Sequence, residues 1–196
     1  MTELSKLADD IFDRTNTYDG EGFRNHCLRL ADFARLHARA MGEDANDDLV
    51  HAGAMLHDLG IVMQRRRGTS YIDRSIDLAR AELFGHLGSD GERALLEQVL
   101  RYNHSLRPLP NLAPLTEAFR RAVFTEHTHG SRRYGLDKVE VKAVLREHPQ
   151  DNFRAVLADF FYRTLVFEPG TIPHIFIPRA PAAAPAWTQN AADPAA

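Results

Sequence analysis

The residues best suited to chemistry are His57 and Asp58, which are adjacent in the run Ala54-Met-Leu-His-Asp-Leu-Gly60. An imidazole and a carboxylate are two of the ligand types that divalent metals use in hydrolytic sites. A third candidate ligand, His26, lies upstream in Asn25-His-Cys-Leu-Arg29. A divalent ion in such a site lowers the pKa of a bound water and so provides a hydroxide nucleophile near neutral pH. These residues therefore predict a mononuclear metal site.

Helices must bring these ligands together, and helical periodicity dominates the chain. The apolar spacing predicts helices over about 4–12, 20–41, 47–59, 73–87, 92–103, 116–129, 138–147 and 152–167. The short connection from Gly42 to Asn46 favours antiparallel packing of the second and third helices, which lets His26 approach His57. Only Ile172 to Ile177 has the composition of an extended segment. We expect an all-α fold of about seven or eight helices.

Composition and charge indicate a soluble globular protein and do not exclude a small phosphorylated substrate. Hydrophobic residues make up 44% of the chain and charged residues 26%, and the formal net charge is −3. These values favour neither nucleic acid nor a membrane as the partner. The single Cys27 excludes an internal disulfide and is expected in the core.

The chain is expected to contain one helical domain and a short tail. Residues 1–178 carry the helical pattern, whereas residues 179–196 are rich in Ala and Pro and are expected to be disordered. No segment approaches the roughly 18 uninterrupted apolar residues of a membrane helix, and the first residues lack the pattern of a signal peptide. We expect a cytoplasmic protein that can form a homodimer.

Other side chains allow both functional and structural interpretations. The downstream half is rich in possible ligands, namely His86, His104, Glu126, His127 and His129. A lone helical His is more often a core or surface residue, and His86 beside Gly88 is explained by the dipole at a helix end. Arg29 lies one turn after His26, where it can hold a phosphate or pair with a carboxylate. Arg65 to Arg67 form an expected exposed loop, and Asp73 is expected to cap the fourth helix.

Taken together, these motifs resemble the HD-domain superfamily of all-helical, metal-dependent phosphohydrolases. The resemblance covers about residues 20–167 and includes four segments: Asn25-His-Cys-Leu-Arg29, Ala54-Met-Leu-His-Asp-Leu-Gly60, Asn103-His-Ser-Leu-Arg107, and Glu117-Ala-Phe-Arg-Arg-Ala122 followed by Arg133-Tyr-Gly-Leu136. It implies that His26, His57 and Asp58 hold one divalent ion such as Mn, Ni, Co, Fe or Zn. It also implies that His104 is a further histidine of the pocket.

One position departs from the pattern of that superfamily. The family usually carries its last metal-binding Asp in a late helix, and Val123 occupies that position here. Val cannot bind a metal, so either the site is degenerate or a neighbour replaces the Asp. Glu126 and His127 lie three and four residues later, on the same helix face, and are the candidate fourth ligands.

The resemblance implies a metal-dependent hydrolase that acts on a small phosphate ester through a metal-bound hydroxide. His104 and Glu126 are the expected catalytic groups for proton transfer, and Arg29 and Asn103 the expected substrate-binding groups. Three alternatives stay open. These are an HD-fold di-iron oxygenase with His86 and His104 as added ligands, a lyase similar to cyanamide hydratase, and a degenerate binding protein.

Overall fold

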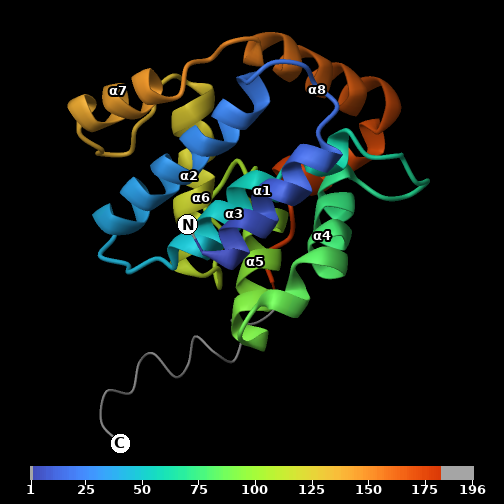
Figure 1. The fold of residues 1–196 in the computed structure, drawn as a ribbon, viewed down its shortest axis with the longest axis horizontal. Coiled ribbons are helices and arrows are strands. Elements are labelled where there is room, and N and C mark those ends of the chain that lie inside the picture. The colour runs from blue at the N-terminus through green and yellow to red at the C-terminus, as the bar shows by residue number, and fades with distance from the viewer. Residues whose placement is uncertain (1, 182–196) are drawn as a thin grey trace, which may run out of the picture.

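The structure is a computed structural model that describes residues 2–181. Within these residues it contains nine α-helices, three short 3-10 helices and no strand, which confirms the all-α prediction (Figure 1). The elements in chain order are α1 (Glu3–Thr15), α2 (Gly22–Ala40), α3 (Asp47–Leu56), η1 (Leu59–Ile61), α4 (Tyr71–Glu82), η2 (Phe84–His86), α5 (Asp90–Tyr102), α6 (Pro114–His127), α7 (Lys138–Glu147), α8 (Phe153–Phe167), η3 (Pro169–Thr171) and α9 (Ile172–Phe176).

Helix α2 is the central helix of the fold. It packs along α6 and also contacts α3, α7 and α8. In Figure 1, α2 runs diagonally beside α6, and α7 and α8 lie along the upper edge of the molecule. The buried apolar residues form one cluster around the first half of α2 with α1, α3, α4 and α8, and a second around its other half with α6 and α7. Because α2 borders both clusters, a polar residue on it can be enclosed from several sides.

Local capping explains where the helices of the site begin. The Asn46 side chain accepts hydrogen bonds from the backbone N–H groups of Asp48 and Leu49, as predicted for the start of α3. Helix α4 begins two residues earlier than predicted. Its cap is Ser70, which exchanges hydrogen bonds with Asp73 in a capping box, so Asp73 is the third residue of the helix and not its cap.

The segment predicted to be extended is instead a short helix. Residues Ile172–Phe176 form α9, and Pro173 is tolerated because the first helical turn needs no N–H donor at that position. The Leu106 N–H donates a hydrogen bond to the Phe176 carbonyl, which ties α9 to the loop after α5. The C-terminal end of the domain therefore returns to the region that contains His104.

Two predictions concern the ends and surface of the chain. The predicted tail lies mostly outside the described residues, since 182–196 are not part of the description. None of the helices within residues 2–181 combines the length and apolar character that a membrane crossing requires. As predicted, Cys27 is buried and the Arg65 to Arg67 loop is exposed.

Candidate metal centre

The three predicted ligands meet in the interior, although they come from different elements. His26 lies on α2, His57 caps the C-terminal end of α3, and Asp58 occupies the turn between α3 and η1. The Nε2 atoms of His26 and His57 are 3.2 Å apart, and Asp58 Oδ2 lies 3.0 Å from His57 Nε2 and 3.9 Å from His26 Nε2. All three side chains are buried. We call this group the metal cluster.

The turn that carries His57 and Asp58 is held by α4. Ser75 on α4 donates its hydroxyl hydrogen to the His57 carbonyl and accepts the Gly60 N–H. A Cβ atom at Gly60 would lie 1.9 Å from the backbone oxygen of Tyr71, so only glycine allows α4 to approach this closely. The Leu-Gly sequence after the His-Asp pair therefore has a packing reason: it lets the start of α4 lie directly against the turn.

The hydrogen-bond partners of the two imidazoles indicate which nitrogen carries the proton. His57 Nδ1 donates to the Ala54 carbonyl at 2.7 Å, so the neutral form of this ring carries its lone pair on Nε2. His26 Nδ1 lies 3.1 Å from the Glu126 carboxylate, which favours the proton on Nδ1, although the angle is too bent for a regular hydrogen bond. Two lone pairs and the Asp58 carboxylate then converge. That donor set fits a divalent cation, because lone pairs facing one another repel unless a cation or a proton lies between them.

Burial and charge shift the pKa values of the cluster in different directions. Burial would lower the pKa of His57, but the Asp58 carboxylate outweighs it and raises that pKa well above its usual range, so a proton on His57 competes with a metal ion. Complete burial lowers the pKa of His26 to about 4, against the opposing effect of Glu126, so this imidazole is neutral. Burial would raise the pKa of Asp58, but the neighbouring His57 and His104 outweigh it and hold that pKa well below its usual range. A neutral imidazole and an ionised carboxylate are the forms that bind a metal.

Glu126 and Arg29 form a buried pair behind His26. Glu126 Oε1 accepts hydrogen bonds from Nε and Nη2 of Arg29 at 2.9 and 2.7 Å. The remaining Nη1 of Arg29 donates to the carbonyls of His148 and Pro149. Both carboxylate oxygens of Glu126 therefore face Arg29 or the imidazoles of His26 and His127. This arrangement orients His26 from its outer side and leaves the Arg29 guanidinium fully engaged.

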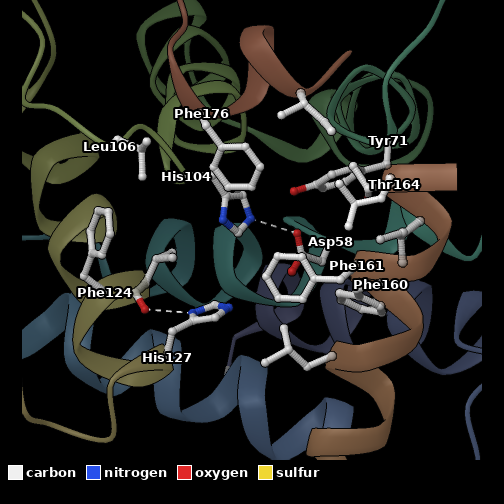
Figure 2. A pocket seen from close by; sticks show the side chains of 15 residues that line it. Asp58, Tyr71, His104, Leu106, Phe124, His127, Phe160, Phe161, Thr164 and Phe176 are labelled. Carbon is white, nitrogen blue, oxygen red and sulfur yellow. Dashed lines mark hydrogen bonds and ion pairs between the residues drawn. The ribbon is translucent and has the colours of Figure 1, made fainter. Parts of the chain in front are cut away.

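A cavity of about 220 Å³ opens beside Asp58. Its polar residues are Asp58, Tyr71, His104, His127 and Thr164. His104 Nε2 donates to Asp58 Oδ1 at 3.0 Å, and His127 Nδ1 donates to the Val123 carbonyl at 2.8 Å (Figure 2). The neutral form of His127 then carries its lone pair on the other ring nitrogen, Nε2, and Figure 2 shows this atom directed into the cavity. The Val123 side chain itself lines the cavity.

Tyr71 is a residue of this cavity that the sequence analysis missed. Its ring lies edge-on to that of His104, with centroids 6.1 Å apart, and its hydroxyl points into the space beside Asp58 (Figure 2). Burial raises the pKa of this phenol well above 10, and Asp58 and Glu168 raise it further. Tyr71 thus stays a neutral hydrogen-bond donor. The only sequence signal for it was the capped start of α4, predicted two residues too late.

Several predicted residues do not reach the cavity among the described residues. The Asn103 amide donates to the carbonyls of Val99 and Leu100 and so closes the end of α5. Arg29 is buried behind His26 and is not part of the lining. His86 is exposed in η2, and His129 is exposed after α6, so neither joins the metal cluster.

Comparison with known proteins agrees with this geometry. Residues 23–118 match the family model of the HD domain. The chain therefore contains an HD domain, as its motifs predicted. The matched range contains His26, His57, Asp58 and His104, but it ends before Val123, Glu126 and His127. No curated protein and no solved structure matches the chain.

Proposed function

We propose that this HD-domain protein is a metal-dependent hydrolase of a small molecule. The observation that carries the proposal is the convergence of two imidazole Nε2 atoms and the Asp58 carboxylate beside the cavity. The family supports the same conclusion, because HD domains are generally metal-dependent hydrolases. Both the ligands and the space for a substrate are thus present.

His26, His57 and Asp58 would hold the ion, and open positions would remain for a water and a substrate. Three protein ligands with an open position are typical of catalytic metal sites. When bound, a divalent ion lowers the pKa of its water and polarises the bond to be hydrolysed. The missing carboxylate at position 123 is compatible with such a site.

Side chains of the cavity would handle the protons. His127 Nε2 is a free acceptor facing the cavity, so it can accept a proton from water. The Tyr71 hydroxyl can donate a hydrogen bond to an oxygen of the substrate as negative charge develops there. His104 holds the Asp58 carboxylate through Oδ1 and leaves Oδ2 directed at His57 and His26.

His127 replaces the absent Asp better than Glu126 does. Glu126 is engaged by Arg29 and His26, whereas His127 lines the cavity and keeps one nitrogen free. We therefore assign Glu126 an orienting function toward His26, in place of the predicted functions as fourth ligand or proton-transfer group. His127 takes the place of the fourth side chain as a base that faces the cavity, since the metal cluster itself contains only His26, His57 and Asp58.

The first experiment is elemental analysis of the purified, untagged protein, expressed per chain and without added metal. About one transition metal, lost when Asp58→Asn is introduced, supports a mononuclear hydrolase. Two irons per chain would instead support the di-iron oxygenase, for which the exposed position of His86 offers no support. No metal after incubation with Mn, Ni or Fe would overturn the proposal and leave a degenerate binding protein.

A further inference from the structure

Most of the side chains that line the cavity beside the metal cluster are apolar. Ten of the fifteen lining side chains are Ile, Leu, Val or Phe. Tyr71 and His104 lie beside Asp58, while α8 contributes four apolar side chains and Thr164 (Figure 2). We call the α8 residues Leu157, Phe160, Phe161 and Leu165, together with Phe176 of α9, the apolar wall.

No Lys or Arg side chain lines this cavity among the residues that the structure describes. Two buried guanidinium groups outside the lining are already paired. Arg29 is bound to Glu126, and Arg74 donates to the Gly60 carbonyl and to Glu168 at 2.6 Å. The exposed Arg65 lies over the ring of Phe167, 3.9 Å from its centroid, beside a neighbouring cleft.

This lining is unfavourable for a phosphate ester. A phosphate group carries up to two negative charges, and proteins usually meet them with Arg, Lys or backbone N–H groups. Burying such an anion against Leu and Phe side chains costs several kcal/mol unless it is paired. Asp58, the nearest charged lining residue, is itself an anion. Only a bound metal ion would offset this, and it would contact one end of the anion.

We propose that the substrate is an uncharged, largely apolar small molecule that carries one hydrogen-bond acceptor at its reacting group. Its apolar body packs on the apolar wall, and its acceptor atom lies near the Tyr71 hydroxyl, beside the metal cluster. That this molecule is hydrolysed rests on the proposed function. That the cavity binds an uncharged molecule does not, because the fit does not depend on the metal.

The volume of the cavity limits the size of this substrate. Apolar cavities of about 150 Å³ bind benzene. A cavity of about 220 Å³ therefore accepts a six-membered ring with a short substituent, or an aliphatic chain of similar volume. The mouth is formed partly by Phe161 and Leu165, which are about half exposed, so a larger molecule can extend past them into solvent.

The test uses two ligand pairs, each of which combines one phenyl ring with either an uncharged or an anionic head group. Binding of acetophenone and of phenylphosphonate is measured by isothermal titration calorimetry. The full chain is used as purified, after metal loading, and after treatment with a chelator. Turnover is then compared for phenyl acetate and phenyl phosphate. We expect acetophenone to bind at least tenfold more tightly than phenylphosphonate in all three preparations, and phenyl acetate to be the better substrate.

A charge placed on the apolar wall sharpens the test. Leu165 lines the mouth and is 57% exposed, whereas its neighbour Val166 is 52% exposed and does not line the cavity. Leu165→Lys should weaken acetophenone binding and strengthen phenylphosphonate binding, and Val166→Lys should change neither. Both side chains are half exposed, so both variants are expected to fold.

Each outcome separates this inference from the proposed function. Tighter binding of phenylphosphonate than of acetophenone, or failure of acetophenone to bind at all, overturns the inference even if the protein contains metal. Acetophenone binding to a protein that never acquires metal overturns the hydrolase and leaves the inference standing. Equal responses of the two lysine variants would also overturn it, because the apolar wall would then not be the binding surface.

Discussion

The metal cluster and the apolar wall are neighbours that are built in opposite ways. His26, His57 and Asp58 are buried and polar, and each is held by a further polar group: Glu126 on α6, the Ala54 carbonyl one turn earlier on α3, and His104 after α5. The apolar wall consists of side chains from α8 and α9 that make dispersive contacts, and its outer members Phe161 and Leu165 are about half exposed. Hydrogen bonds that orient polar side chains dominate the metal cluster, and apolar contact area dominates the apolar wall.

This difference predicts how each region responds to mutation. Removing one member of the metal cluster leaves buried polar partners unsatisfied, and such losses are large and far from additive. Removing one member of the apolar wall takes away apolar contact area with the substrate, and water can fill part of the space that is left. We therefore expect mutations near the metal cluster to change chemistry and metal content, and mutations on the apolar wall to change substrate affinity.

The largest effect is expected from His57→Ala. Loss of a metal ligand should remove the bound ion and lower kcat by more than the roughly 100-fold that loss of an outer partner costs. Metal content and kcat are measured on the same preparation. The control is His37→Ala. His37 lies on α2 and is as buried as His57, but its ring hydrogen-bonds to Thr125, away from the metal cluster. Full metal content in His57→Ala would mean that the cluster is not the site.

The second prediction concerns Tyr71, where the two regions meet. Tyr71→Phe removes only the hydroxyl, so kcat should fall about 100-fold, as for loss of one donor to a developing negative charge. Metal content should stay unchanged, which separates this change from damage to the cluster. Tyr134→Phe is the matched control, because the Tyr134 hydroxyl is buried without a partner and Tyr134 does not line the cavity. An unchanged kcat in Tyr71→Phe would remove Tyr71 from the mechanism.

The sequence predicted the metal cluster better than the apolar wall, for a physical reason. His57 and Asp58 are adjacent at a helix end, and the short connection to α2 limits where His26 can lie. Glu126, the partner of His26, was harder to predict. It lies 97 residues after Arg29, and it reaches Arg29 and His26 only because α2 packs on α6. Likewise, the apolar residues of α8 have the same pattern whether they fill a core or line a cavity. That Val123 occupies the position of the family's last metal-binding Asp stays a prediction, because the family match ends at residue 118.

The third prediction separates orientation from ligation. Glu126→Gln keeps a side chain that can contact Arg29 and His26 but removes the charge, so metal affinity should fall about 10- to 100-fold. It should not abolish binding, as loss of a true ligand would. Glu117→Gln is a close control, since Glu117 also pairs with arginines on α6 but lies outside the site. Metal affinity is measured by competition with a chelator, and complete loss in Glu126→Gln alone would make Glu126 a ligand.

The smallest effect is expected on the apolar wall. Leu165→Ala removes part of a half-exposed side chain, which corresponds to about 1 kcal/mol of lost contact, or about fivefold in KM. The value of kcat and the metal content should not change, because Leu165 lies at the mouth and its side chain has no polar atom that could hold a member of the metal cluster. Val166→Ala, with the same exposure but outside the cavity, should leave KM unaltered. If Leu165→Ala lowered kcat and left KM alone, the two regions would not be independent, because packing on α8 would then act on the chemistry itself.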